Sequence, residues 1–329
     1  MPANLPPQYY EAERRYRAAR GEQEKIAILY EMLAIMPKHK GTDKLQAELR
    51  AKISRLKRQI QKKRATLKKT YGFHIPKQGA GQVVLIGAPN TGKSQIVQKL
   101  TNISIEVAPY PFTTREPAVG MMKFENIKIQ LIDTPPITGN FIEPYLPEII
   151  RNADLILFIV DLASDGVLEE TEEVKKKLRQ FKIELGSREK VDNQREGWMY
   201  KRTMMVGNKT DLKGANERLE ILRDLYEKEF PITPISAKEV EKLNDLKREI
   251  YKALNIIRVY TKIPGKPADL NDPIVLKKGS TVIDAAVAIH KDFVQKLKYA
   301  RIWDSDKFNG QRIDRDSILK EGDILEFHI

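Results

Sequence analysis

Apolar residues in the middle of the chain form short runs that alternate with longer amphipathic stretches. The runs have the length and composition of buried strands, and the stretches between them have helical spacing. Five such runs occupy residues 83–86, 127–132, 155–160, 203–206 and 232–235. Strands that alternate with helices imply a mostly parallel sheet covered by helices on both faces. The pattern therefore predicts an α/β domain over residues 76–255.

The first segment, residues 1–75, has a helical pattern throughout. Residues 10–35 are predicted to form one helix, and proline and glycine within residues 37–43 should end it. A second helix follows, with an apolar seam of alternating fours and threes, in which Lys63 takes one place. The seam consists of Leu49, Ile53, Leu56, Ile60 and Leu67. These features predict a helical hairpin, and the glycines and proline of residues 71–81 predict a linker after it.

The last segment, residues 256–329, has a third pattern. Short strand candidates occupy residues 257–260, 274–276, 299–303 and 324–328, and a helix candidate at residues 282–297 lies among them. This arrangement predicts a small α+β module.

Charge is concentrated in the helical segment. The chain of 329 residues has a formal net charge of +13, and residues 44–69 hold eleven Lys or Arg against the single acid Glu48. The last 74 residues hold thirteen bases against eleven acids and are nearly neutral. A basic stripe indicates a polyanionic partner, either RNA or an anionic membrane surface. A solvated helix face that keeps the protein soluble is the alternative.

Composition also bears on the compartment. The chain has no cysteine, which excludes disulfides and thiolate metal sites. The longest apolar run, residues 155–160, is too short to span a bilayer, and the N-terminus lacks the apolar stretch of a signal peptide. We therefore expect a cytoplasmic protein.

A glycine-rich loop follows the run at residues 83–86 and opens the next helix. It fits the P-loop pattern G-x-x-x-x-G-K-[ST], whose backbone N–H groups and helix N-terminus face a phosphate. The loop comprises Gly87, Ala88, Pro89, Asn90, Thr91, Gly92, Lys93 and Ser94, and Gln95 follows it in the predicted site. We expect Lys93 to reach the β- and γ-phosphates of a nucleotide, and Ser94 to offer its hydroxyl to Mg²⁺.

Two later motifs identify the base. Asn208, Lys209 and Asp211 follow the run at residues 203–206, and a carboxylate there can accept two hydrogen bonds from guanine N1 and N2. Adenine offers no such pair of donors, so a site built for guanine rejects it. Lys209 would lay its stem over the base. The next run is followed by Ser236, Ala237 and Lys238, where backbone N–H groups can meet guanine O6.

Two further segments are expected to sense the γ-phosphate. The first spans residues 111–117, where Phe112 is placed beside the nucleotide and Thr114, or alternatively Thr113, would ligate Mg²⁺. The second begins at Asp133, which would hold Mg²⁺ through a water. We expect Lys93 and Thr114 to contribute most to catalysis. An ordinary proline-containing loop is the alternative for each segment.

These motifs resemble a known family. The string YPFTTREP at residues 110–117, with Gly120, resembles the switch I signature of GTPases of the Obg superfamily. The strings KHKGTD at residues 38–43 and GF at residues 72–73 resemble the developmentally regulated GTP-binding (DRG) branch. Residues 256–329 resemble a TGS domain, a ubiquitin-like β-grasp module; the strings at 258–261, 278–282 and 321–323 carry this likeness.

The resemblance implies a P-loop G domain between basic helices and a β-grasp tail, with a role linked to RNA or the ribosome. It also implies that Asn90 corresponds to the asparagine that holds an activating K⁺ in related GTPases, although a simple P-loop filler is an equal alternative. The stretch between residues 160 and 208 is too short for the domain inserted in eukaryotic members. We therefore expect a bacterial or archaeal type of relative.

One position departs from the family pattern. The glycine of the switch II motif D-x-x-G is replaced by Pro136, which has no N–H to offer the γ-phosphate. Ile137 stands where Ras-type enzymes carry a water-orienting glutamine, as is usual in this superfamily. Arg115 could be read as an arginine finger supplied in cis, but a surface or salt-bridged arginine is the better interpretation.

Three functions remain open from the sequence. The leading one is an Mg²⁺-dependent GTP hydrolase with slow intrinsic turnover, which acts as a switch on RNA or a ribosome-linked partner. The second is a GTP- or GDP-binding scaffold in which Pro136 has removed the switch. The third makes the basic helices a membrane-surface anchor, which the narrow apolar seam disfavours.

Overall fold

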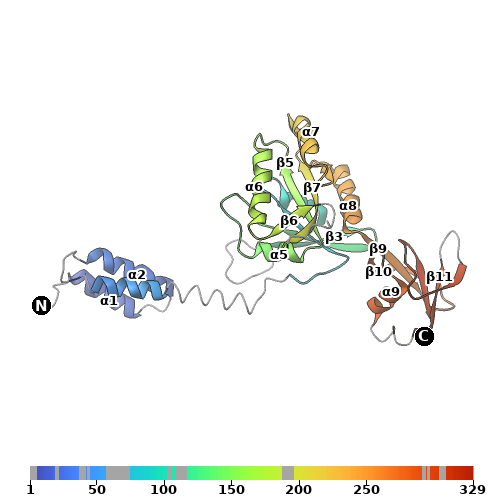
Figure 1. Cartoon of the computed structure of the whole chain (residues 1–329), viewed down its shortest axis with the longest axis horizontal. Helices are drawn as coiled ribbons and strands as arrows, with labels where there is room; N and C mark the ends of the chain where they lie inside the picture. Colours follow the sequence, from blue (N-terminus) through green and yellow to red (C-terminus); the bar gives the residue numbers. More distant parts are fainter. Residues whose placement is uncertain are drawn as a thin grey trace. The chain divides into compact units, whose positions relative to one another are not determined.

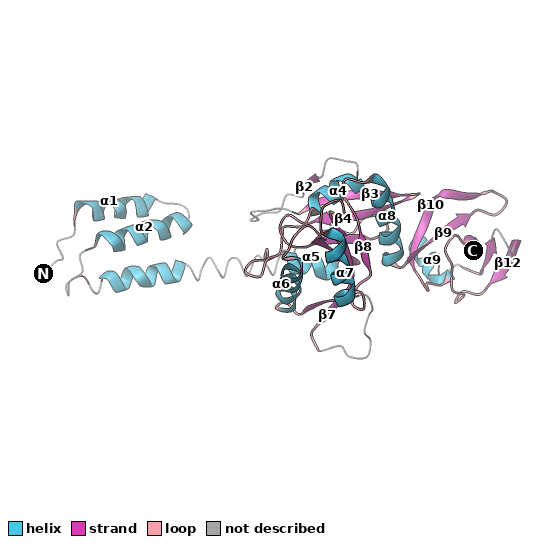
Figure 2. Cartoon of the chain, turned by 90° about the horizontal axis from the view of Figure 1, so that it is seen from above, coloured by secondary structure: helices cyan, strands magenta, loops and turns pink. Residues whose placement is uncertain are grey.

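The computed structural model of the chain describes residues 6–18, 22–36, 42, 45–56, 75–101, 106–107, 117–186, 196–290, 294, 297–303 and 309–328. The chain divides into two compact units, Met1–Phe73 and His74–Ile329. Each is described by itself, with the element labels of Figure 1 and the helices and strands distinguished in Figure 2. No helix in these ranges is long and apolar enough to cross a membrane.

The first unit is helical, but the predicted helix at residues 10–35 is wrong as a single element. The chain forms α1 (Pro7–Ala18) and α2 (Glu22–Ile35), and residues 45–56 are helical as well. Gly21 lies between α1 and α2 in the sequence, and glycine has a low helix propensity. The break has a packing consequence, because Tyr9 and Ala12 of α1 join one core with Leu29 of α2.

The predicted seam of the second helix is partly within the described residues. Leu49 and Ile53 are buried in the same core, and Leu56 packs against it. At these three positions the seam therefore packs the helices of the first unit together. Ile60, Lys63 and Leu67 lie outside the described residues.

The centre of the second unit is an eight-stranded sheet. Five of its strands match the predicted runs and pair only in parallel among themselves: β1 (Gln82–Ile86), β4 (Ile127–Asp133), β5 (Leu155–Asp161), β7 (Met199–Asn208) and β8 (Ile232–Pro234). Three strands were not predicted: β2 (Glu106–Val107) and β3 (Ala118–Phe124), which extend the sheet antiparallel beyond β4, and β6 (Ile183–Gly186), which pairs with β7. The strand order is β2-β3-β4-β1-β5-β7-β6, with β8 also on β7.

Helices cover both faces of this sheet, as predicted. They are α4 (Lys93–Thr101), α5 (Leu146–Asn152), α6 (Val167–Arg179), α7 (Ala215–Tyr226) and α8 (Val240–Leu254). Helices α4 and α8 bury their apolar residues in one core with β1, β5 and β7. Figure 1 shows α6 and α8 on opposite sides of the sheet. Parallel strands with both faces covered place loops at the carboxyl edge, where ligands bind in such folds.

The predicted linker at residues 71–81 is wrong over its described part. Ile75 is buried, and its carbonyl accepts a hydrogen bond from Gln82 Nε2 at 3.1 Å. The Ala80 N–H donates to the Lys128 carbonyl at 2.7 Å, which attaches this segment to β4. This segment therefore packs against the α/β sheet, which binds the Ile75 carbonyl and the Ala80 N–H.

The C-terminal module is a five-stranded sheet with one helix packed on it. Its strands are β9 (Ile256–Lys262), β10 (Ala268–Lys277), β11 (Tyr299–Trp303), β12 (Asn309–Ile313) and β13 (Ile324–His328), in the order β10-β9-β13-β11-β12. The four predicted strands are present, and β12 was missed. Helix α9 (Val282–Ile289) is shorter than predicted, because His290 adopts an extended conformation that ends it. Leu297 nevertheless packs into the module's core with Val282.

The α/β domain and the C-terminal module make direct contacts within the second unit. The turn between β3 and β4 presents Glu125 and Asn126, and the Arg258 guanidinium of β9 donates to both side chains. The same guanidinium pairs with Glu321 at 2.7 Å, and Asn126 Nδ2 donates to the Tyr260 hydroxyl at 2.9 Å. These contacts join the two domains within the second unit.

Candidate nucleotide-binding site

The glycine-rich loop between β1 and α4 has the backbone shape that a P-loop requires. Gly87 has φ +155°, and a Cβ there would lie 2.3 Å from the Ile159 carbonyl oxygen. Gly92 has φ +91°, and a Cβ there would lie 2.4 Å from Asn208 Nδ2. Only glycine fits both positions without a clash. The loop therefore turns tightly between the end of β1 and the N-terminus of α4, where backbone N–H groups are available to an anion.

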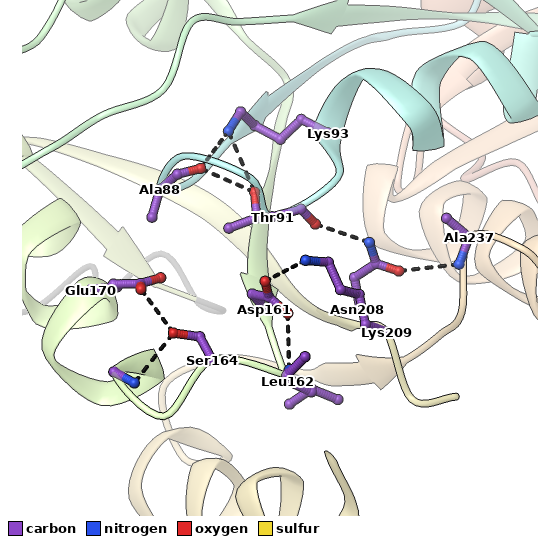
Figure 3. A network of polar contacts seen from close by, with 12 residues as sticks. Ala88, Thr91, Lys93, Asp161, Leu162, Ser164, Glu170, Asn208, Lys209 and Ala237 are labelled. Carbon is purple, nitrogen blue, oxygen red and sulfur yellow. Dashed lines mark hydrogen bonds and ion pairs between the residues drawn. The ribbon is translucent and has the colours of Figure 1, made fainter. Parts of the chain in front are cut away.

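Lys93 lies over the loop that precedes it, as Figure 3 shows. Its Nζ donates to the carbonyls of Gly87 at 3.1 Å and Ala88 at 2.8 Å, and lies 3.4 Å from the Thr91 hydroxyl. Burial lowers the pKa of Lys93 to about 8, and the nearby Asp133 carboxylate opposes this shift. The ammonium is thus held at the mouth of the loop, where the loop's phosphate ligand would lie.

Asp133, at the end of β4, has the features of a cation ligand. Its Oδ1 is buried and has no hydrogen-bond partner among the described residues. Burial raises the pKa of its carboxyl, although a hydrogen bond with Ser94 and the charge of Lys93 act in the opposite direction. A buried carboxylate oxygen without a partner is costly unless a cation or donor meets it. The pair of Asp133 and Ser94 therefore fits Mg²⁺, which prefers such oxygens.

The base-recognition motif is bonded directly to the phosphate loop through Asn208. Its Nδ2 donates to the Thr91 carbonyl at 2.9 Å, and its Oδ1 accepts from the Ala237 N–H at 3.1 Å. The side chain is almost fully buried, so these bonds are well shielded from water. Asn208 therefore ties three loops together (Figure 3) rather than standing as a separate ligand.

Asp211 and the Ser-Ala-Lys loop form the second half of this region. Asp211 accepts from the Ser236 hydroxyl at 2.9 Å and from Lys238 Nζ at 2.8 Å. These two hydrogen bonds, the one from Lys238 first, hold the pKa of Asp211 below its usual range. The carboxylate is thus ionised at neutral pH and acts only as an acceptor, which suits the N–H edge of guanine.

Lys209 has a partner that the sequence did not point to. Its Nζ donates to Asp161 Oδ2 at 2.5 Å, and its backbone has a left-handed φ of +71°. Asp161 ends β5 in register with Asn208 at the end of β7. The sequence contains one indication of this role, because Asp161 directly follows an apolar run, as Asp133 does.

Family models match both parts of the second unit. Residues 82–190 match the family described as 50S ribosome-binding GTPase, and residues 257–329 match the TGS domain family. Together these matches span more than half of the chain. The chain is a P-loop GTPase with a TGS domain, an organisation of the DRG type. Its G domain binds guanine nucleotides, and its C-terminal module is a TGS domain.

Full-length relatives have the same organisation. A GTP-binding protein of Methanocaldococcus jannaschii is 29% identical over 361 residues, covering 93% of this chain and 92% of the relative. One of Halobacterium salinarum is 26% identical, covering 93% and 98%. The developmentally-regulated GTP-binding protein 2 homolog of Dictyostelium discoideum is 28% identical, covering 93% and 99%. These alignments are longer than the chain's own 329 residues, so each relative contains segments that this DRG-type protein lacks.

Switch II of this DRG-type protein is fastened to the P-loop by an unexpected bond. Pro135 and Pro136 have no N–H, and the next one, from Ile137, donates to the Gly87 carbonyl at 3.1 Å. Ile137 is fully buried. Further along, the Gly139 N–H donates to Glu173 of α6 at 3.2 Å. The segment is therefore held by its own protein contacts at the point where the family pattern has a γ-phosphate donor.

Switch I falls largely outside the described residues. Phe112, Thr113, Thr114 and Arg115 all lie there, so the structure does not bring them to the site or exclude them. Gly120, the last residue of the switch I signature, is described and lies in β3. A Cβ at Gly120 would meet Thr101 of α4 at 2.6 Å, which gives this glycine a packing role.

The remaining predicted residues line the outer side of the loop. Pro89, Asn90 and Gln95 are exposed, and Asn90 has a left-handed φ of +61°. Asparagine tolerates this conformation better than most residues. An exposed side-chain carbonyl on the loop is compatible with a K⁺ ligand, and equally with a turn residue.

Proposed function

We propose that this DRG-type protein hydrolyses GTP to GDP and phosphate and acts as a molecular switch. The observation that carries the proposal is the Asn208 side chain, which joins the phosphate loop to the guanine motif through Thr91 and Ala237. A preformed connection of this kind fixes the distance between base and phosphates, and positioning is most of catalysis in phosphoryl transfer. Bound GTP would therefore meet an oriented Lys93.

The proposed roles follow from the charges around the loop. Lys93 would contact the β- and γ-phosphates, and the loop's N–H groups would hold the phosphate oxygens. Ser94 and Asp133 would hold Mg²⁺, the latter through a water, and Mg²⁺ supplies positive charge beside the transferred phosphate. Thr114 of switch I would add a further ligand. Asn90 is the proposed K⁺ ligand, and we propose slow turnover without a partner.

A second function is favoured by switch II. Because the Ile137 N–H is bonded to Gly87 and the two preceding residues are prolines, this segment offers the γ-phosphate no backbone donor among those three positions. A scaffold that binds GTP and GDP alike, with little hydrolysis, would have this arrangement. The hydrolase remains the leading proposal because Lys93 and the unpartnered Asp133 oxygen are both in place.

We propose RNA, in a ribosome-linked setting, as the partner. On the described helix at residues 45–56, Arg50, Lys52 and Arg55 are exposed while the apolar seam is buried. The TGS domain contributes exposed Arg301 and Arg312, which are neighbours in register on adjacent strands. Exposed cations on two separate modules suit an extended polyanion.

The TGS cations are combined with aromatic rings. The Arg312 guanidinium lies 4.6 Å and that of Arg301 5.9 Å from the centre of the Tyr299 ring, and Lys262 lies 3.8 Å from that of Trp303. These side chains lie on the sheet face opposite α9, since Ala300 and Leu325 face the core. Cations interleaved with aromatic rings are typical of surfaces that bind single-stranded nucleic acid.

The proposed domain limits are 1–75 for the basic helices, 76–255 for the G domain and 256–329 for the TGS domain. They place each functional element in one domain: the polyanion contacts in the first and third, and the nucleotide site in the second. Within the second unit, the contacts of Arg258 with the β3–β4 turn would link the G domain to the TGS domain.

The experiment that separates switch from scaffold measures RNA affinity by fluorescence anisotropy in two nucleotide states. The protein is loaded with GDP or with a non-hydrolysable GTP analogue, and single-turnover release of phosphate from GTP is followed in parallel. The switch predicts phosphate release and different affinities in the two states. Equal affinities without phosphate release would establish the scaffold. Vesicles of anionic lipid at the same salt concentration test the membrane alternative.

A further inference from the structure

Asp161 is a buried carboxylate beside the guanine side of the site that belongs to none of the nucleotide-binding motifs. It ends β5, and the parallel register places it level with Asn208 at the end of β7. Its side chain is 11% exposed. A carboxylate so little exposed requires hydrogen-bond or ion-pair partners, because removing it from water is costly without them.

Both oxygens of this carboxylate have defined partners (Figure 3). Oδ1 accepts from the Ala163 N–H at 2.9 Å, which fixes the orientation of the group. Oδ2 accepts from Lys209 Nζ at 2.5 Å. An ion pair with one largely buried member is screened less by salt and water than a surface pair. The pair therefore holds the Lys209 ammonium in one place.

Lys209 is held at its backbone end as well. Its left-handed φ of +71° is unusual for a residue with a side chain, and such conformations persist where neighbouring contacts enforce them. The Thr210 N–H donates to the Ile235 carbonyl at 3.1 Å, and the Leu212 N–H donates to the Lys209 carbonyl at 3.1 Å. With backbone and ammonium both fixed, the four-carbon stem between them has few conformations left.

We infer that Asp161 is a positioning residue for guanine nucleotides, which acts by holding the Lys209 stem extended against the face of the base. The inference rests on the proposed assignment of Lys209 to the base. Asp211 already has its own lysine, Lys238, so each of the two lysines has a separate carboxylate. Fixing the stem before the nucleotide arrives removes an ordering cost from binding.

The test uses four variants of the full chain. Asp161→Asn keeps the shape and an acceptor for the Ala163 N–H but removes the charge, and Lys209→Met keeps an apolar stem but removes the ammonium. The double variant combines them. Asp165→Asn is the matched control, because Asp165 is an exposed acid of the same loop that pairs with Arg218 instead.

Affinities for GDP and IDP are measured by displacement of a fluorescent GDP, with melting temperatures as a check on folding. Asp161→Asn should weaken both nucleotides about tenfold and by equal factors, because the ring face is common to both bases. The double variant should be no weaker than Lys209→Met alone. Asp165→Asn should bind as the wild type does.

Several results would overturn the inference. Wild-type affinity in Asp161→Asn, or losses that multiply in the double variant, would show that Asp161 does not act through Lys209. A loss for GDP much larger than for IDP would assign Asp161 to the edge of the base instead. Wild-type affinity in Lys209→Met would overturn the assignment of Lys209 as well. None of these binding results depends on whether the protein hydrolyses GTP.

If Asp161→Asn does not fold, substitutions at the partly exposed Lys209 still decide the matter. Lys209→Arg keeps the ion pair with Asp161 and should bind GDP within about threefold of the wild type, whereas Lys209→Met should lose about tenfold. Equal affinities of these two variants would overturn the inference, since the ammonium's partner would then be irrelevant to binding.

Discussion

The two ends of the nucleotide site are built differently. On the guanine side, the side chains of Asn208, Lys209 and Asp211 are each hydrogen-bonded to other groups of the protein. On the γ-phosphate side, Asp133 Oδ1 has no partner among the described residues, and the Ile137 N–H is already bonded to Gly87. Under the proposed function, base selection would be organised by contacts that the fold already makes. The response to the γ-phosphate would then depend on Lys93, Asp133, Mg²⁺ and switch I.

The largest change in nucleotide preference is expected from a substitution on the guanine side of the site. Asp211→Asn replaces the acceptor for the guanine N–H groups by an amide, and the preference for GTP over ATP should fall by about a thousandfold. Xanthosine triphosphate, which carries a carbonyl at C2, should bind better to this variant than to the wild type. Competition binding with the three nucleotides measures this, with Asp224→Asn on α7 as the control. Unchanged GTP preference would remove Asp211 from the site.

A smaller effect, a gain in preference for the GTP form, is expected from restoring a backbone N–H donor on the γ-phosphate side. Pro136→Gly supplies an N–H at the position where the family pattern has one, and should raise the affinity ratio of a GTP analogue to GDP by about tenfold. The two dissociation constants are measured by calorimetry, with Pro135→Gly as the matched control. An unchanged ratio would mean that the hydrogen bond from the Ile137 N–H to Gly87, rather than the proline, limits the contact of switch II with the γ-phosphate.

The phosphate side should also depend on pH. Because burial lowers the pKa of Lys93 to about 8, the ammonium is present below this value and lost above it. Bound phosphates favour the charged form, so nucleotide binding should take up a proton above the pKa and weaken by about eightfold between pH 7.5 and pH 9. Affinities of GDP across this range measure the effect. Lys93→Arg stays charged over this range, so its GDP affinity should not fall with pH. A pH profile identical to that of the wild type would assign the pH dependence to another group.

The smallest effect concerns Asn90. If its side chain holds K⁺, turnover in KCl should exceed that in NaCl by about fivefold, and Asn90→Ala should abolish the difference. Gln95→Ala, at an exposed position in the first turn of α4, serves as the control. Equal stimulation in Asn90→Ala would identify this residue as a turn former only.

The sequence was sufficient for the parts of the fold that depend on local pattern. The five buried runs, the P-loop and the base motifs all depend on residues close together in the chain. Strand β3 was missed because Gly120 and Lys123 interrupt its apolar residues and because it directly follows the predicted switch I segment. The break between α1 and α2 was missed because a single glycine was outweighed by continuous helical spacing.

Contacts between distant residues could not be predicted. The pair of Asp161 and Lys209 spans 48 residues and depends on the register of β5 with β7. The bond from the Ile137 N–H to the Gly87 carbonyl depends on how closely switch II passes the P-loop. In both cases the residue types were visible in the sequence, but their partners are chosen by the packing of the sheet.

The most direct test of the central claim is steady-state GTP turnover by the full chain with Mg²⁺, in KCl and in NaCl. ATP is the control nucleotide, and Lys93→Ala is measured beside the wild type. The account predicts phosphate release from GTP but not from ATP, well above the level of Lys93→Ala. GTP that binds tightly but releases no more phosphate than Lys93→Ala in either salt would contradict hydrolysis and leave a nucleotide-binding scaffold.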